Sequence, residues 1–183
     1  MATKVLVVVD VQNDFVKGGV LAYGFPKQDN TGLIEKEVKE AVRNGDIVYA
    51  TRDSHIDDYY LRSLEGQMLP IKHCIYDTKG WNLVPWLKEL ADEDIVQVYD
   101  KSTFGSVTLP DGIRKRIKRG DEISEIRIMG YCSSICVLAN AVILRAAFPN
   151  TKITVLKDLC GDIDEESHLA ALMVMKNQQI EIE

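Results

Sequence analysis

The sequence predicts an α/β protein in three layers, with helices on both faces of a doubly wound, mainly parallel sheet of six strands. Two observations carry this prediction. Short runs rich in Val and Ile alternate along the chain with longer segments of helical periodicity. Several of these runs are apolar at nearly every position, which is typical of strands covered by helices on both faces. With 183 residues, 46% of them hydrophobic and 27% charged, the chain predicts a single domain over residues 1–183.

Six segments have the composition of strands, because they are short, rich in β-branched residues and bounded by polar or turn-forming residues. They cover residues 4–9, 46–50, 94–99, 125–129, 152–156 and 179–182. Five longer segments carry apolar residues at helical spacing. They cover residues 31–43, 83–91, 110–118, 134–147 and 164–176. The last of these has an acidic first turn and a basic end, which favours a helix through its dipole.

The connection over residues 53–79 is long and has little periodicity. Loops of this length inside a compact domain are usually functional or disordered. This one is rich in His, Asp, Tyr and Glu and does not have the Gly, Ser and Pro content of a linker. We therefore interpret it as a functional segment.

The formal charge of -6 and the pI near 5.2 argue against a partner with a phosphate backbone or an anionic membrane surface. The single basic run, residues 114–119, is interpreted as a solvated helix face. The N-terminus enters an apolar strand directly, and no apolar stretch approaches the length that crosses a bilayer, so we expect a cytoplasmic protein. Its four cysteines are then expected to be thiols. Homo-oligomer formation stays open.

Polar and reactive side chains follow four successive predicted strands. Asp10 ends the first, Asp53 and His55 follow the second, Lys101 follows the third, and residues 130–136 follow the fourth and open a helix. In an open α/β sheet, ligands bind at the carboxyl ends of the strands. Each residue alone is weak evidence, since an acid after a strand is often a turn residue and a lysine there usually faces solvent. Their occurrence at one edge predicts a functional site.

A carboxylate and two imidazoles from this region form a candidate metal site. Asp53, His55 and His73 are ligand types suited to zinc or another first-row divalent ion. Glu65 lies in the same loop and is a further candidate. The alternative for the first pair is a loop histidine that is hydrogen-bonded to its neighbour. His168 lies within the last predicted helix and is interpreted as a packed residue.

Cys136 lies where the fourth strand turns into a helix. A helix N-terminus lowers the pKa of a thiol, because its unpaired N–H groups favour the thiolate. The alternative is a buried cysteine that packs as a small hydrophobic residue, and we adopt it for Cys74 and Cys160. The residues alone thus leave Cys136 as either a nucleophile or a packing residue.

With these residues identified, the sequence resembles the isochorismatase-type cysteine hydrolases, and most of all their nicotinamidase branch. The resemblance runs from the first strand to the last helix. It rests on six segments: VDVQNDFVKGGVLA (9–22), TRDSH (51–55), LPIKHCIYDTKGW (69–81), YDKSTFG (99–105), GYCSSICVLANA (130–141) and DLCGDIDEESHLAALMVMK (158–176). The first of these segments is long and specific.

The resemblance implies an α/β hydrolase that cleaves small amides through a thioester, with nicotinamide as the expected substrate. It places Cys136 as the nucleophile, Asp10 as its base and Lys101 as the cation between them. Backbone N–H groups of Cys132 and Cys136 are expected to form the oxyanion hole.

The same resemblance implies a ring pocket and a metal. Phe15 and Phe104 are expected to contact the substrate. A divalent ion, zinc or alternatively manganese or iron, is expected on a ligand set made up of Asp53, His55, His73 and, as a candidate, Glu65.

The chain departs from the family pattern at two places near the nucleophile. Residues 105–107 read Gly-Ser-Val where a Ser-Ala-Phe-like triplet is frequent, and Ser134 stands where many relatives have Asp. The pocket wall, and with it the choice of substrate, is therefore left open. The family pattern also implies a cis peptide between Tyr131 and Cys132.

Four other functions remain open. They are an amidase for N-carbamoyl or ureido compounds, an isochorismatase, a binding module for small molecules or metals without turnover, and a redox role for Cys132 and Cys136. The candidate metal ligands argue against a metal-free amidase, and the expected dependence on the thiol argues against an isochorismatase.

Overall fold

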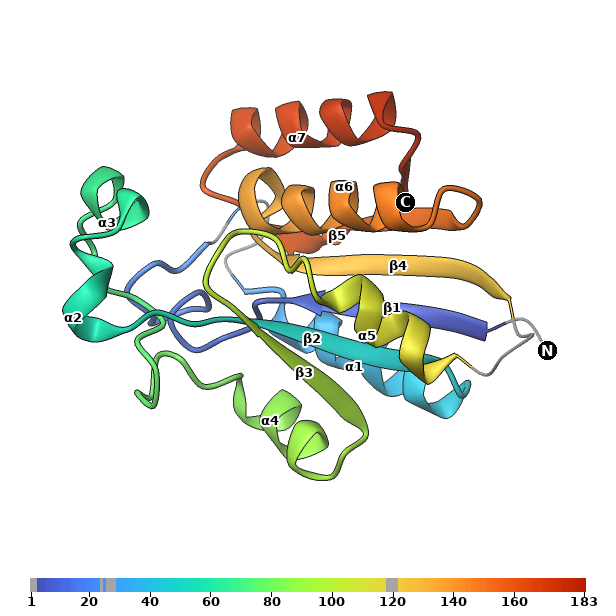
Figure 1. The fold of residues 1–183 in the computed structure, drawn as a ribbon, viewed down its shortest axis with the longest axis horizontal. Helices are drawn as coiled ribbons and strands as arrows, with labels where there is room; N and C mark the ends of the chain where they lie inside the picture. Colours follow the sequence, from blue (N-terminus) through green and yellow to red (C-terminus); the bar gives the residue numbers. More distant parts are fainter. Residues whose placement is uncertain (1–2, 24, 26–28, 118–121) are drawn as a thin grey trace.

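A six-stranded parallel sheet forms the centre of the computed structural model, which describes residues 3–23, 25, 29–117 and 122–183 (Figure 1). The strand order is β3-β2-β1-β4-β5-β6, and each neighbouring pair is parallel. The strands are β1 (Thr3–Val9), β2 (Ile47–Asp53), β3 (Val96–Lys101), β4 (Ile123–Tyr131), β5 (Lys152–Gly161) and β6 (Glu181–Ile182). The predicted fold class is confirmed.

The central strand β1 is buried on both faces. Val5, Val7 and Val9 point to one face and Leu6 and Val8 to the other, and all five are fully buried. The strand pairs with β2 on one side and with β4 on the other. The continuous apolar run in the sequence is therefore explained by helices that cover both faces.

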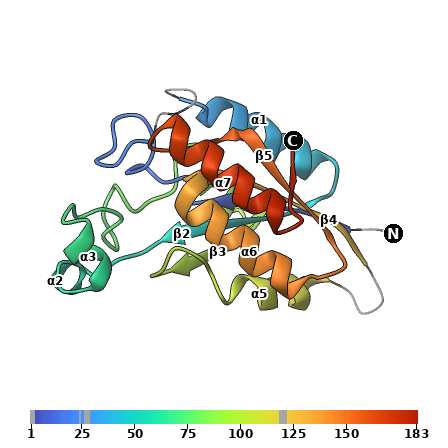
Figure 2. The same ribbon diagram turned by 90° about the horizontal axis from the view of Figure 1, so that it is seen from above.

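Helices cover the two faces in the order that right-handed crossovers require. The chain first steps from β1 to β2 and β3, and then returns across the sheet to β4, β5 and β6. This reversal places the helices of the first half opposite those of the second, and Figure 2 shows α1 on one side with α5 and α6 on the other. The five long helices are α1 (Thr31–Arg43), α4 (Pro85–Asp92), α5 (Leu109–Arg116), α6 (Leu138–Ala147) and α7 (Glu165–Asn177).

The connection after β2 contains two short helices that periodicity did not reveal. They are α2 (Asp57–Tyr60) and α3 (Leu64–Met68), and they project beyond the carboxyl ends of the strands (Figure 1). The Ser63 side chain caps α3 by accepting a hydrogen bond from the Gly66 amide at 3.0 Å. Helices of four and five residues are too short to carry an apolar stripe.

Most other element ends lie within one to three residues of their predicted positions, and three elements show further differences. A π-helical turn, η1 (Ser133–Val137), precedes α6 where the sequence predicts one continuous helix. Strand β5 continues to Gly161 although charged residues interrupt its apolar pattern. Helix α5 ends at Arg116, and the predicted end of this helix at Lys118, like Arg119 of the basic run, lies outside the described residues. Among the described helices, none has the length and apolar character needed to span a bilayer.

Candidate active site

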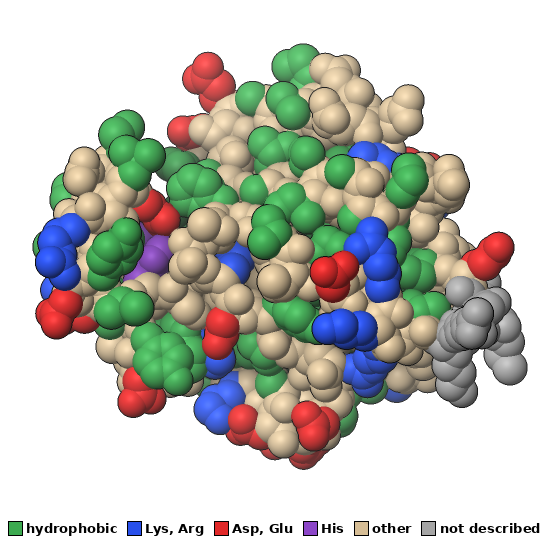
Figure 3. Space-filling view, in the orientation of Figure 1, with side chains coloured by type: hydrophobic (Ala, Val, Ile, Leu, Met, Phe, Trp, Pro, Cys, Tyr) green, Lys and Arg blue, Asp and Glu red, His purple; other side chains and the backbone are tan. Residues whose placement is uncertain are grey.

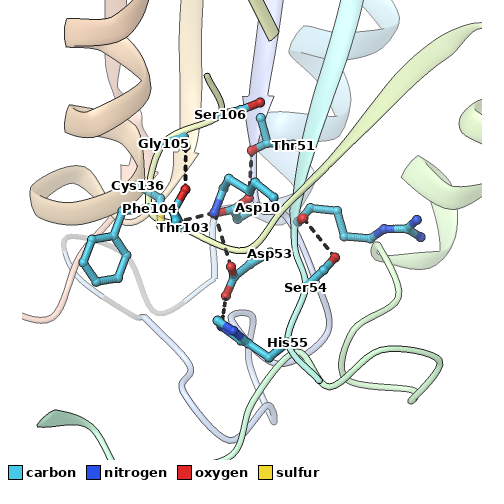
Figure 4. A network of polar contacts seen from close by, with 12 residues as sticks. Asp10, Thr51, Asp53, Ser54, His55, Thr103, Phe104, Gly105, Ser106 and Cys136 are labelled. Atoms are coloured by element: carbon cyan, nitrogen blue, oxygen red, sulfur yellow. Dashed lines mark hydrogen bonds and ion pairs between the residues drawn. The ribbon is translucent and has the colours of Figure 1, made fainter. Parts of the chain in front are cut away.

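Four strand ends bring the predicted polar residues together at one edge of the sheet (Figure 4). Asp10 follows β1, Asp53 ends β2, Lys101 ends β3, and Cys136 lies in the η1 turn after β4. The edge includes the point between β1 and β4 where the strand order reverses. Asp10 has a φ of 52°, so the chain turns sharply there, and the Gln12 amide donates to the Asp10 carbonyl.

Lys101 connects the other three residues. Its Nζ lies 2.7 Å from Asp10 Oδ2, 3.5 Å from Asp53 Oδ1 and 3.6 Å from Cys136 Sγ. The parallel register explains the second contact, because Asp53 and Lys101 are paired across β2 and β3. On the other side, Thr51 Oγ1 donates to Asp10 Oδ1 at 2.7 Å. The buried carboxylate of Asp10 is thus held from two sides.

Burial sets the protonation of the thiol. It raises the pKa of Cys136 well above the usual range, and the carboxylates of Asp10 and Asp53 act in the same direction, while the Lys101 ammonium opposes them. The sequence-based expectation of a lowered thiol pKa is therefore wrong, because the helix-dipole argument did not include desolvation. A thiol in this state needs a base before it can attack.

The two carboxyl groups beside Lys101 are shifted in opposite directions. Burial raises the pKa of Asp10 above its ordinary value, although Lys101 and Thr51 oppose the shift. Burial also acts on Asp53, but there the Lys101 ammonium and the imidazoles of His55 and His73 outweigh it and hold the pKa well below its usual range. Asp10 is accordingly the carboxylate that is suited to accept a proton, and Asp53 is suited to stay ionised.

Four donor groups, from the end of β2 and the loop that follows it, converge beside this cluster. One ligand atom from each of Asp53, His55, Glu65 and His73 lies within 4.8 Å of the other three. His55 Nε2 is 2.8 Å from Asp53 Oδ2, and Glu65 Oε1 is 3.6 Å from the Nε2 atoms of both histidines. His73 Nδ1 lies 2.8 Å from the Ile71 carbonyl, and a hydrogen bond there leaves Nε2 free to bind a metal. Two imidazoles with two carboxylates fit a divalent first-row ion.

Gln12 and Asp14, which we did not single out in the sequence, hold this group in place. The Gln12 side chain accepts from the Asp53 amide at 2.7 Å and donates to the carbonyls of Asp53 and Trp81 at 2.9 and 2.8 Å. Asp14 Oδ2 accepts from the amide of Cys74, next to His73, at 2.7 Å. Their signal in the sequence is two polar residues directly after a buried strand, in the segment that carries the strongest family resemblance.

A cavity of about 880 Å³ opens over these residues. Its inner end is lined by Cys136, Asp53 and the two histidines. Figure 3 shows imidazole in the hollow beside the projecting lobe, which is formed by α2 and α3. Phe15 is buried, lines the cavity and lies 5.6 Å from His73 between ring centroids. Phe104 also lines the cavity and is 48% exposed. Both predicted aromatic residues therefore face the same cavity.

The turn that carries Cys136 has its own set of supports. The peptide between Tyr131 and Cys132 is cis, as the family pattern implies. The Cys132 carbonyl accepts hydrogen bonds from the amides of Ile135 and Val137, at 3.2 and 3.0 Å, and the second of these is an i→i+5 bond. Asp162 accepts from both the amide and the hydroxyl of Ser134 at 2.8 Å.

His168 lies outside the candidate metal group, as expected for a packed residue. It is buried, and its Nδ1 lies 2.8 Å from Ser133 Oγ. Cys74 and Cys160 are fully buried, in agreement with their interpretation as packing residues.

Comparison with known families decides the assignment of the chain. The sequence profile of the Isochorismatase domain family matches residues 4–182. The chain belongs to the isochorismatase family. An isochorismatase family protein of Bacillus subtilis is 32% identical over 95% of this chain and 94% of its own length. The nicotinamidase of Escherichia coli is 26% identical over 90% of this chain and 85% of its own length.

A solved structure supports the same family assignment. The crystal structure of the nicotinamidase/pyrazinamidase of Bacillus subtilis superposes on this isochorismatase-family chain with a TM-score of 0.82. The two chains are 26% identical, and the match covers 98% of each. The similarity therefore includes the whole sheet and both helical layers.

Proposed function

We propose that this protein is a nicotinamidase, which hydrolyses nicotinamide to nicotinate and ammonia. One observation carries the proposal: Asp10, Lys101 and Cys136 form a continuous buried chain of contacts, and Cys136 at the end of this chain lines the cavity. The relatives named nicotinamidase in Escherichia coli and Bacillus subtilis support the choice of substrate. We further propose that residues 1–183 form a single isochorismatase-like hydrolase domain.

The proposed reaction begins with proton transfer from Cys136 to Asp10. Lys101 stabilises the thiolate through its charge as the proton leaves. The thiolate then attacks the amide carbonyl, and a carbon–sulfur bond forms. We propose that the backbone amides of Cys132 and Cys136 stabilise the oxyanion, because both belong to the turn that presents the sulfur. Asp10 returns the proton to the nitrogen as the carbon–nitrogen bond breaks. Ammonia departs, and the acyl group remains bound to Cys136 as a thioester.

Water completes the proposed cycle. Asp10, again a carboxylate, accepts a proton from the water that attacks the thioester carbonyl. The carbon–sulfur bond breaks, the acid is released, and the sulfur regains its proton from Asp10. The raised pKa of Asp10 fits a residue that gains and loses a proton in each half of the reaction.

We propose that Asp53, His55, His73 and Glu65 hold a zinc ion, since two imidazoles with two carboxylates suit that ion. Such an ion supplies Lewis acidity and positive charge next to the substrate ring. Phe15, which packs near His73, would lie against the ring. Asp53 contacts both Lys101 and His55 and so joins the metal group to the reacting thiol.

The cellular setting is proposed from the same residues. The four cysteines are all free and buried, which fits a reducing compartment, and we propose the cytoplasm. The proposed partner is a small amide, and the acidic net charge of -6 fits neither nucleic acid nor an anionic membrane.

Ammonia release tests the proposal. Purified protein, loaded with zinc, is incubated with nicotinamide, and ammonia is measured beside a Cys136→Ala variant. We expect turnover by the wild type and its loss in the variant. A panel of N-carbamoyl and ureido compounds in the same assay identifies the related amidase function, which would replace nicotinamide hydrolysis if only those compounds released ammonia.

A further inference from the structure

The cavity is much larger than a single-ring amide requires. Its volume of about 880 Å³ lies in the upper part of the range for sites that hold drug-sized ligands, about 300–1,000 Å³. The reacting groups occupy only its inner end, where Cys136 and the candidate metal group lie. An outer chamber therefore remains in front of any small substrate that reaches the sulfur.

The wall of this outer chamber is apolar. Helices α2 and α3 and the residues flanking them contribute Ile56, Tyr59, Leu64 and Met68, and the segment after β3 contributes Phe104. Their exposed fractions are 69, 59, 77, 81 and 48%, respectively. So many large apolar side chains around one opening mark a binding surface.

Local contacts fix the conformation of the lobe formed by α2 and α3, which carries most of this wall. The Tyr60 hydroxyl donates to the Leu69 carbonyl at 2.8 Å and ties the two ends of the lobe together. A Cβ at Gly66 would lie 2.0 Å from the Tyr60 carbonyl oxygen, so only glycine permits this close approach of α3 to α2. The apolar side chains are therefore held in position by local packing.

We infer that the site accepts aromatic amides that carry an apolar substituent on the ring, and that the outer chamber binds this substituent. This inference rests on the proposed function, because the carboxamide must lie at Cys136. The reaction is unchanged: the ring-bearing amide and water give the corresponding acid and ammonia. The segment after Lys101 carries Phe104 and so contributes to this chamber.

A pair of substrates tests the inference. Nicotinamide is compared with a nicotinamide that carries a phenyl group on the ring carbon opposite the one that bears the carboxamide. We expect the wild type to hydrolyse the phenyl compound with a kcat/KM at least equal to that for nicotinamide. In the variant Leu64→Ser/Met68→Ser, the ratio of the two kcat/KM values should fall about tenfold or more, since apolar contacts in a pocket give discrimination of this size.

Leu61→Ser is the matched control. Leu61 belongs to the same lobe and is 47% exposed, but it lies outside the cavity lining, so the ratio should stay as in the wild type. The inference would be overturned if the wild type hydrolyses nicotinamide but has a kcat/KM for the phenyl compound more than about tenfold below that for nicotinamide. The proposed function would then remain intact. An equal loss for both substrates in the double variant would do the same.

Binding separates the inference from the proposed function. In the Cys136→Ala background, the phenyl compound should bind at least about tenfold tighter than nicotinamide, and Leu64→Ser/Met68→Ser should remove this advantage. Equal binding of the two amides contradicts the outer chamber. Hydrolysis of neither amide by the wild type refutes the proposed function, while the binding comparison still decides the inference.

Discussion

The ammonium of Lys101 lies 2.7 Å from the carboxylate of Asp10, and both side chains are buried. A buried carboxylate without a cation is costly, and a buried cation without an anion is equally so. The same ammonium lies 3.6 Å from the Cys136 sulfur. One side chain therefore keeps the base charged and favours the thiolate as it forms.

Removal of Lys101 should reduce both stability and turnover. Lys101→Met leaves Asp10 buried without its ion-pair partner, so we expect the free energy of unfolding to fall by about 3–5 kcal/mol. Urea unfolding of the zinc-loaded protein measures this loss, and kcat should fall by about 100-fold or more.

A double variant separates the two effects. Lys101→Met with Asp10→Asn removes both charges and should recover much of the stability, but it should regain no activity. Turnover by Lys101→Met close to that of the wild type would show that the lysine is not required for the chemistry.

Thr51 should set the pH at which Asp10 becomes protonated. Its hydroxyl donates to Asp10 Oδ1 and favours the carboxylate, so Thr51→Val removes a hydrogen bond that opposes the raised pKa. The active carboxylate is present above the folded-state pKa and is lost as the pH falls through it. We expect the acid limb of the kcat/KM profile to move to higher pH in the variant, with kcat/KM lowered about tenfold near its plateau.

Metal content distinguishes this effect from loss of the ion. Zinc bound by Thr51→Val, measured across the same pH range, should equal that of the wild type. An acid limb that stays in place would show that Asp10 does not control the activity.

His73 should be required for metal binding. Its Nε2 faces Asp53 and Glu65, so His73→Ala removes one of four donors, and we expect the affinity for zinc to fall by about 100-fold or more. His168→Asn is the matched control, because His168 is also buried but lies outside the group. Equal zinc affinity in the two variants, measured by competition with a chelator, would refute the ligand assignment.

Gln12 should act on the metal without touching it. Gln12→Leu keeps the volume but removes three hydrogen bonds to the backbone of Asp53 and Trp81. We expect the affinity for zinc to fall about 10- to 100-fold, as for other residues that orient ligands. Asn13→Ala removes a contact of the same loop at an exposed position and should change the affinity much less. A normal zinc affinity in Gln12→Leu would show that the hydrogen bonds of the Gln12 side chain do not position the ion.

Much of this arrangement could be predicted from the sequence. The apolar run before Asp10 and the alternation of strands with helices predict a parallel sheet, and the rule for strand ends then places Asp10, Lys101 and Cys136 at one edge. The order of the strands was not predicted, because a doubly wound sheet with right-handed crossovers permits more than one order.

The remaining features depend on tertiary structure. Gln12 contacts Trp81, 69 residues away in the chain, and such a side-chain contact with a distant backbone has no local pattern. Helices α2 and α3 are too short for periodicity to reveal them. The pKa of Cys136 was predicted in the wrong direction because the extent of its burial depends on how the strands and helices pack.

The covalent intermediate tests the central claim most directly. Zinc-loaded protein is mixed with nicotinamide, quenched in acid within the first turnovers and analysed by mass spectrometry with peptide mapping. We predict a nicotinoyl group on Cys136 in the wild type and none in Cys136→Ala, which should also release no ammonia. Sustained ammonia release by Cys136→Ala, at a rate close to that of the wild type, would contradict the account.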